Sequence, residues 1–240
     1  MCNDFGNNVP YSAYLQAFSA IPLPVVFPTA APNLEPRDDI WPTEPAPVFR
    51  RREEGVEMVQ LRWGFPPARP KGAPIINFRS EGRRFPKGRC LIPASHFFEF
   101  TGAKSPKSKW KFTKAGEEWF CFAGLWRPMP DGAGDAFTLL TTDPGPDVAP
   151  IHDRQMAVLD RADWPAWLDL TRPRLNCFVP FPPGAWSSSR SGSKSQGVEG
   201  PLRWLLLIES RLGSSGAAEK CGCCGVADLP AIRVRLVAAL

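Results

Sequence analysis

The chain has 240 residues, of which 43% are hydrophobic and 22% charged, and this composition excludes wholesale disorder because it supplies a sizeable core. Its 28 prolines and 20 glycines exclude a long helical bundle, a coiled coil and a helical solenoid, since both residue types interrupt helices. The net charge is only +5, so any affinity for nucleic acid must come from local patches.

The first predicted element is a short helix at residues 12–20, and the last is a short helix at residues 162–169, with Asp163 as N-cap and Pro165 in the first turn. Residues 22–49 hold eight prolines and are expected to run as extended or turn segments. From Glu57 onward, short apolar runs alternate with Gly, Pro and charged turns, which is the spacing of successive β-strands. These runs are 58–65, 90–93, 97–100, 110–112, 119–126, 137–142 and 155–159.

The pattern breaks after residue 172. Residues 187–195 are rich in Ser, Arg, Gly and Lys and are typical of a linker, and residues 201–240 show no periodicity. Cys221, Cys223 and Cys224 lie close together but lack a second pair or a nearby His, so we expect no metal site and no cofactor.

The sequence shows no membrane span and no secretory signal, and we expect a cytoplasmic protein with reduced thiols.

Two side chains are candidates for acid–base chemistry. His152, one of only two histidines, lies between a Pro-rich turn and an apolar strand, a common place for an active-site residue. Glu99 lies between Phe98 and Phe100, and desolvation there would raise the pKa of its carboxyl and suit it to general acid–base work. The alternatives are a surface turn histidine and a glutamate that faces solvent from a strand.

Cys2 offers a chemistry that no other position can. If Met1 is removed, Cys2 carries an α-amine and a thiol, with reference pKa values of about 8 and 8.5. Such a pair condenses with an aldehyde to an imine, and the thiol then closes a five-membered thiazolidine ring. The alternative is an incidental cysteine at a frayed terminus.

Several polar and basic residues suit a nucleic acid. Asn77 and Arg79 are two apart, so in a strand both face the same way, and an amide beside a guanidinium suits a phosphate or a sugar, unless they are only a strand-end polar pair. Basic residues interleaved with aromatics suit single-stranded DNA, although a solvated loop would look alike. The basic runs are Arg83, Arg84, Lys87 and Arg89, and Lys104, Lys107, Lys109 and Lys111 around Trp110 and Phe112.

Several segments, in order along residues 1–172, resemble the motifs of one family, the SOS response-associated peptidases (SRAP). The chain starts with Met1-Cys2, as that family does. The other matching segments are Leu61-Arg62-Trp63-Gly64-Phe65, Asn77-Phe78-Arg79-Ser80-Glu81, Arg89-Cys90-Leu91-Ile92-Pro93-Ala94 with Phe97-Phe98-Glu99-Phe100, Phe122-Ala123-Gly124-Leu125-Trp126, Phe137-Thr138-Leu139-Leu140-Thr141-Thr142, and Ile151-His152-Asp153-Arg154-Gln155-Met156.

The resemblance implies an SRAP domain over residues 1–172 with an α+β fold, a mostly antiparallel, barrel-like β core and a few peripheral helices. It implies that the substrate is the ring-opened aldehyde of an abasic site in single-stranded DNA, and that the protein removes its own Met1. Cys2 would be the nucleophile, Asn77 would position the N-terminus and the sugar, Glu99 would be the acid–base group, and His152 would serve ring opening and reversal. The DNA contacts would come from Arg79, Trp63, Arg84, Lys87 and Trp110.

The chain departs from the family at both ends. Asn3-Asp4 replaces the Gly-Arg that often follows Cys2, which puts a negative charge where a DNA-facing Arg can lie. Residues 175–182 read LNCFVPFP, and one string of codons encodes both this and the family-like AELLRPLP in adjacent frames. We therefore expect residues 173–240 to be an atypical tail, with a frameshift near Pro173, that packs poorly on residues 1–172.

Two other functions remain open at this point. One is a cysteine peptidase using Cys2, His152 and Glu99, which would need the thiol but not the α-amine. The other is a non-covalent module for single-stranded DNA, whose binding would survive loss of Cys2 and weaken steeply with salt. In each case we expect a monomer without a membrane partner.

Overall fold

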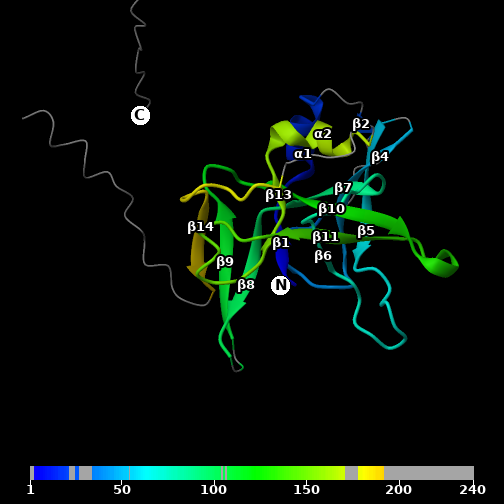
Figure 1. Cartoon of the computed structure of the whole chain (residues 1–240). Helices are drawn as coiled ribbons and strands as arrows, with labels where there is room; N and C mark the ends of the chain where they lie inside the picture. The colour runs from blue at the N-terminus through cyan, green and yellow to red at the C-terminus, as the bar shows by residue number, and fades with distance from the viewer. Residues whose placement is uncertain are drawn as a thin grey trace, which may run out of the picture. The chain divides into compact units, whose positions relative to one another are not determined.

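The computed structural model describes residues 3–21, 25–26, 34–53, 55–103, 105, 107–170 and 178–191. Two sheets and two short helices dominate this part of the chain (Figure 1). All but three of the strand pairings are antiparallel, which confirms the predicted α+β class with a mostly antiparallel core.

The larger sheet has nine strands. Its order is β12 (Gln155–Met156), β11 (Asp135–Thr142), β10 (Phe120–Pro128), β7 (Arg89–Ala94), β4 (Pro45–Arg52), β5 (Gly55–Trp63) and β2 (Val25–Val26), with β13 (Val158–Leu159) on β10 and β6 (Asn77–Arg79) on β11. Strand β5 also pairs in parallel with β11, where Phe137 faces Trp63, so β11, β10, β7, β4 and β5 close a ring of pairings.

The smaller sheet has five strands and carries Glu99, one of the predicted catalytic residues, on β8. Its order is β14 (Trp186–Arg190), β9 (Ser108–Lys114), β8 (His96–Thr101), β1 (Phe5–Asn7) and β3 (Arg37–Ile40). The N-terminal strand β1 therefore lies between β8 and β3. Phe5 of β1 reaches the aromatic core, where its ring lies 5.1 Å from that of Trp63 and 5.6 Å from that of Phe122.

Every predicted strand after residue 57 is present, but the proline-rich segment holds more order than the sequence indicated. Strand β4 runs through Pro45 and Pro47 and lies between β5 and β7. Proline lacks the N–H that a central strand must donate. Strand β4 pairs with β7 only at Phe49 and Arg50, beyond the two prolines. Pro45 and Pro47 therefore lie where no N–H has to be donated to β7.

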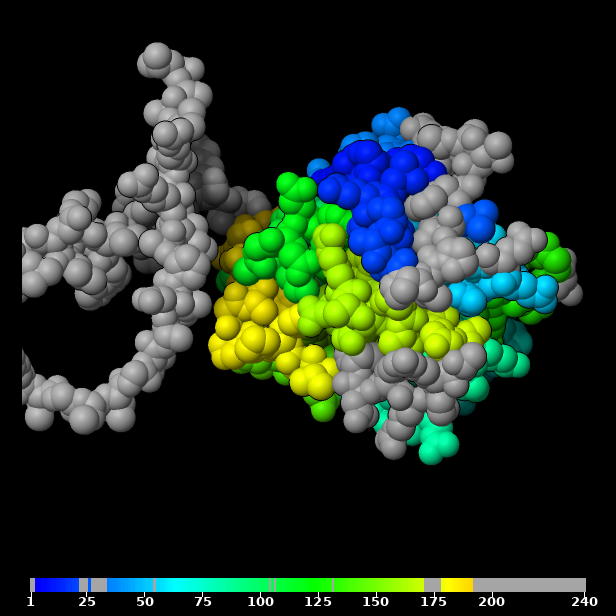
Figure 2. Space-filling model, turned by 90° about the horizontal axis from the view of Figure 1, so that it is seen from above, coloured from blue at the N-terminus to red at the C-terminus, as the bar shows by residue number. Residues whose placement is uncertain are grey.

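The helices α1 (Tyr11–Ser19) and α2 (Trp164–Leu168) lie side by side, as the views in Figures 1 and 2 agree. The Phe18 ring of α1 stacks on the Trp164 ring of α2 at 5.3 Å. Helix α2 is shorter than the prediction for residues 162–169, because a 3-10 turn (Arg161–Asp163) precedes it and its last residue is Leu168. A second 3-10 turn, Pro130–Gly132, precedes β11.

Part of the predicted tail belongs to the folded core. Strand β14 pairs with β9 over five residues, and the Trp186 ring lies 5.2 Å from that of Phe97 and 5.1 Å from that of Phe120. The expectation of poor packing is therefore wrong for residues 178–191, because an aromatic side chain and a strand edge anchor them. The cysteines at 221–224 and the rest of residues 192–240 lie outside the described residues, and the frameshift and the domain boundary stay predictions.

Candidate active site

A cleft of about 300 Å3 opens where the smaller sheet meets the loop before β12. The described residues that line it are Asn3, Trp41, Glu99, Phe100, Lys107 and His152. They come from the residues just before β1, the turn after β3, strand β8, the loop before β9, and the loop between β11 and β12. The cleft thus gathers two of the predicted catalytic residues, Glu99 and His152, next to the start of the chain.

Glu99 is only 1% exposed, so the alternative of a solvent-facing glutamate is wrong. It lies opposite Trp110 in the β8–β9 ladder, two residues along from the pair Phe97 and Phe112, whose rings stack at 4.9 Å. Residues two apart in a strand share a face, so the aromatic pair and the carboxyl lie on one side of the sheet. Trp110 is half-buried, and its indole N–H donates to the Thr101 hydroxyl at 3.0 Å.

His152 faces Glu99 across the cleft, with Nε2 3.7 Å from the Glu99 Oε2. The backbone N–H of Arg154 donates to Nδ1 at 3.0 Å, so Nδ1 is the acceptor and the neutral ring carries its proton on Nε2, toward Glu99. Burial lowers the pKa of His152 from its usual 6.5, although the exposed Asp153, 3.0 Å from Nδ1, works in the opposite direction. At neutral pH His152 is therefore an uncharged donor aimed at a buried carboxyl.

Arg154 fixes the loop that carries His152, and sequence reasoning gave it no role. Its buried guanidinium lies 2.7 Å from Glu81 and 2.8 Å from Asp143, and it donates to the Thr141 hydroxyl at 3.1 Å. The hydrogen bond from Arg154 lowers the pKa of the Glu81 carboxyl. These contacts tie the loop to β11 and to the turn after β6, which holds the His152 ring in place.

Asp4 is fully buried beside Lys109, whose Nζ lies 2.6 Å from the Asp4 carboxylate and also contacts Asp39. Burial raises the pKa of Asp4 to about 7, whereas the hydrogen bond from Lys109 lowers the pKa of the more exposed Asp39. The expectation that Asp4 would place a negative charge toward DNA is therefore wrong, because its carboxyl points into the protein. Lys109 is held by these two carboxyls and also sits over the Phe98 ring at 3.7 Å.

The other histidine, His96, is a structural residue. Its Nδ1 lies 2.9 Å from the Ser95 hydroxyl and its Nε2 lies 2.9 Å from the carbonyl oxygen of Asp38, which joins β8 to β3 across β1. Burial lowers the pKa of His96 as well. Only glycine fits opposite its ring, since a Cβ on Gly6 would lie 2.1 Å from it.

The remaining predicted residues do not all gather at the cleft. Asn77 is half-buried on β6, beside Leu139 of β11, and is not among the described residues that line the cleft. Arg79, Arg84 and Lys87 are exposed on β6 and in the following loop, so their predicted contacts with DNA stay predictions. Cys2, the predicted nucleophile, lies outside the described residues.

Trp63 needs a correction. Its side chain is fully buried, it stacks on Phe137 at 6.3 Å, and its indole N–H donates to the Ile76 carbonyl at 3.0 Å. A ring enclosed on both faces has no surface for a DNA base, so Trp63 belongs to the core. The sequence could not separate it from an exposed tryptophan, because both fit a strand.

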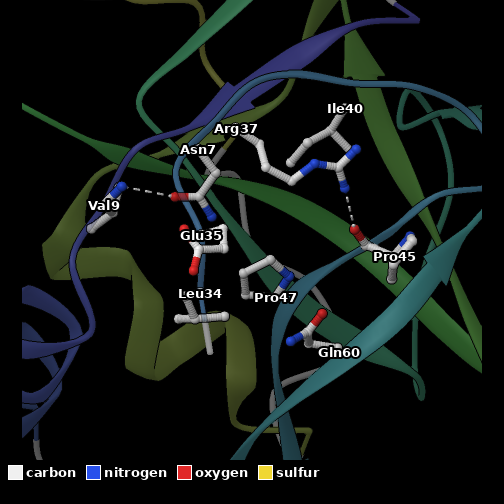
Figure 3. A pocket seen from close by; sticks show the side chains of 9 residues that line it. All are labelled: Asn7, Val9, Leu34, Glu35, Arg37, Ile40, Pro45, Pro47 and Gln60. Carbon is white, nitrogen blue, oxygen red and sulfur yellow. Dashed lines mark hydrogen bonds between the residues drawn. The ribbon is translucent and has the colours of Figure 1, made fainter. Parts of the chain in front are cut away.

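A second cavity, of about 120 Å3, lies among β1, β3, β4 and β5 (Figure 3). Its described lining residues are Asn7, Val9, Leu34, Glu35, Arg37, Ile40, Pro45, Pro47 and Gln60. Two of its polar side chains are already committed, since Asn7 accepts from the Val9 N–H at 3.1 Å and Arg37 donates to the Pro45 carbonyl at 3.1 Å. It is smaller than the usual site for an organic ligand.

Within the described ranges, no three His, Cys, Asp or Glu side chains gather as metal ligands would. The same ranges hold no helix with the length and apolar character that a membrane crossing requires.

The fold and the cleft define an α+β protein with a buried carboxyl facing a half-buried imidazole beside its N-terminal strand. Residues 1–183 match the family described as SOS response associated peptidase (SRAP), and the chain belongs to this family. It is 26% identical over 185 residues to the abasic site processing protein YoaM of Bacillus subtilis, a match that covers 70% of this chain and 79% of that protein. It is 32% identical over 127 residues to the abasic site processing protein YoqW of the same organism, covering 46% of this chain and 56% of that protein.

Solved structures resemble the fold. A protein from Bordetella bronchiseptica superimposes with a TM-score of 0.61 at 22% identity, covering 81% of this chain and 100% of that chain. A phage-related protein from the same organism gives a TM-score of 0.62 at 18% identity, covering 80% of this chain and 95% of that chain. At these identities the likeness concerns the fold.

Proposed function

We propose that this protein processes abasic sites in single-stranded DNA, and that after removal of Met1 it forms a covalent thiazolidine with the sugar through Cys2. The observation that carries the proposal is the buried Glu99 facing the half-buried His152 in a cleft that Asn3 also lines. Relatives with the name abasic site processing protein support the substrate. The protein would thereby shield the lesion during the response to DNA damage.

The proposal requires the Cys2 amine and thiol to reach the cleft. Asn3 lines the cleft, and the Cα atoms of bonded residues lie about 3.8 Å apart, so Cys2 is within reach of it. Strand β1, which follows Asn3 and Asp4, pairs with both β3 and β8 and fixes the direction from which the N-terminus arrives. The buried Asp4–Lys109 contact adds a second anchor two residues after Cys2.

The first chemical step joins the amine to the aldehyde. The neutral α-amine of Cys2 attacks C1′ of the ring-opened sugar, and the carbinolamine loses water to give an imine. An α-amine with a pKa of about 8 is partly neutral at pH 7, unlike a lysine. Loss of water requires a proton on the leaving oxygen, and Glu99 would deliver it.

The second step closes the ring. The Cys2 thiol adds to the imine carbon, a C–S bond forms, and the thiol proton ends on the nitrogen, so the whole reaction releases one water. Neutral His152, with its Nε2 proton toward Glu99, would hold the carboxyl in position and serve ring opening and reversal. Asn77 would position the N-terminus and the sugar.

In the proposal, the same cleft also removes Met1. Water hydrolyses the Met1–Cys2 peptide bond and leaves free methionine and the Cys2 α-amine, the activity for which the family is called peptidases. Exposed Arg79, Arg84 and Lys87 and half-buried Trp110 would contact the strand on either side of the lesion. Unpaired DNA is expected to react faster than duplex, because pairing and stacking restrict access to the sugar.

A denaturing gel with a labelled abasic oligonucleotide tests the proposal. The wild type should give a heat-stable shifted band. Cys2→Ser should give a band only after borohydride reduction, because it forms the imine but cannot close the sulfur ring. A form with one extra residue before Cys2, left uncleaved, should give neither band, since its α-amine is an amide.

The same gel separates the alternatives. Equal crosslinking by the wild type and the extended form would contradict the aminothiol mechanism. A simple cysteine peptidase would give no crosslink in any form but would cleave peptides through the thiol. A non-covalent binding module would retain DNA in a native gel, without Cys2 and with steep salt dependence, and show nothing on the denaturing gel.

A further inference from the structure

One large aromatic side chain is exposed at the mouth of the cleft. Four large apolar side chains are exposed in the described part of the chain, namely Leu15, Val26, Trp41 and Val179, and Trp41 is the aromatic one, with 41% exposure. It lines the same cleft as Glu99 and His152. An exposed tryptophan beside buried acid–base groups calls for an explanation, since burying it would have stabilised the fold.

A tightly bonded turn holds Trp41 in this place. The Glu44 N–H donates to the Trp41 carbonyl at 3.1 Å, and the Glu44 carboxylate accepts from the Trp41 N–H at 2.7 Å. Thr43 in this turn has a φ of +79°, a left-handed backbone conformation that is strained for a β-branched residue. Its N–H donates to the Trp63 carbonyl at 2.7 Å, which ties the strained turn to the ring of strands.

Cations accompany the aromatic face. The Lys109 Nζ lies 5.3 Å from the centre of the Trp41 ring, and exposed Lys107 lines the cleft next to it. Since Lys109 is shared between two carboxyls, Lys107 is the cation of this pair that is open to a ligand. An aromatic face for a base and an ammonium for a phosphate are the two parts from which single-strand binding sites are built.

We infer that Trp41 is a stacking platform for the nucleobase next to the abasic sugar, with Lys107 on the adjoining phosphate. The inference rests on the proposed function. An abasic nucleotide has no base of its own, so stacking energy at the cleft must come from a neighbour in the strand. Trp41 would therefore set how tightly, and in which base context, the lesion is held, without taking part in the chemistry.

The experiment pairs protein variants with two oligonucleotides. In one the abasic site is flanked by thymidines, and in the other it is flanked on both sides by tetrahydrofuran spacers, which lack a base. At protein concentrations below saturation, Trp41→Ala should slow crosslinking to the thymidine-flanked site about 10-fold and to the spacer-flanked site less than about twofold. Trp41→Phe should keep most of the wild-type rate, because it keeps an aromatic face.

The controls isolate stacking from folding. Leu15→Ala removes another exposed apolar side chain, on α1 and not among the described cleft residues, and should change neither rate. Trp41→Leu keeps apolar bulk without an aromatic face and should behave like Trp41→Ala. Equal losses on both oligonucleotides, or no loss on either, would overturn the inference.

A second measurement keeps the inference separate from the proposed function. Undamaged oligothymidine should quench the tryptophan fluorescence of the wild type more than that of Trp41→Phe, whether or not any crosslink forms. If the wild type fails to crosslink but this difference is present, the proposed chemistry fails and the platform stands. If the wild type crosslinks and the difference is absent, the platform fails alone.

Discussion

The two histidines of the chain occupy environments that look alike and do different work. Both lie in the smaller sheet or beside it, and burial lowers the pKa of both. Both ring nitrogens of His96 hydrogen-bond within the protein, one with the Ser95 hydroxyl and the other with the backbone carbonyl of Asp38. His152 turns one nitrogen to the backbone of Arg154 and the other across a cleft to Glu99.

The difference teaches how a histidine that only stabilises the fold differs from one that is placed for the proposed chemistry. A lowered pKa is common to both, so the direction of the pKa shift does not separate them. What separates them is the partner. His96 contacts a hydroxyl and a backbone carbonyl inside the protein. His152 faces an ionisable carboxyl, and both side chains line the cleft. The first arrangement stabilises β1, and the second can move a proton.

The largest expected effect is on the functional side of this comparison. Glu99→Gln should slow crosslinking to abasic single-stranded DNA by about 100-fold or more, because an amide cannot donate and accept a proton in turn. Its shape is conserved, so the free energy of unfolding should change little. A gel time course measures the rate, and Glu118→Gln, at an exposed glutamate in the loop between β9 and β10, is the matched control. Wild-type rates in Glu99→Gln would remove Glu99 from the mechanism.

Substitution of His96 should change the stability of the fold. His96→Ala should lower the free energy of unfolding by about 2–3 kcal/mol, because it leaves a cavity and two buried polar groups without their partner. His152→Ala should cost less than about 1 kcal/mol, since its side chain is partly exposed and lines a cleft. Urea unfolding of the two variants gives both values. Equal costs would mean that His152 is also chiefly structural.

A further expected effect is a pH dependence of stability. Asp4 has a pKa of about 7 in the folded protein against 3.8 for a free carboxyl, so the folded state holds this proton more tightly than the unfolded state. Its contribution to stability is then fully present below pH 3.8 and is lost as the pH rises through 7. The difference in unfolding free energy between the wild type and Asp4→Asn, followed from pH 4 to 8, isolates Asp4. A difference that does not change with pH would contradict the assignment.

Local patterns carried much of the fold and part of the site. Short apolar runs bounded by Gly, Pro and charged turns were enough to predict the strands after residue 57, because turn residues mark where each strand ends. Two features depended on distant contacts and were missed. Strand β4 tolerates its prolines because β7 pairs with it only beyond them, at Phe49 and Arg50. Strand β14 is held by the Trp186 ring, which packs in the core.

The candidate site shows the same division. Glu99 and His152 could be picked out from their neighbours and from the family resemblance. The sequence could not predict that Trp63 is buried, that Asp4 points inward or that Trp41 is exposed. Each of these depends on which side of a strand or turn faces another element. Arg154 was visible in its motif, but its contacts with Glu81 and Asp143 join residues far apart in sequence.

The most direct test of the central claim is the intact mass of the purified protein, alone and after incubation with an abasic single-stranded oligonucleotide. The account predicts a protein without Met1 and then a single adduct, equal to protein plus oligonucleotide minus one water. Tandem fragmentation should place the adduct on Cys2. A protein that lacks Met1 and stays unmodified, or an adduct on any other residue, would contradict the account.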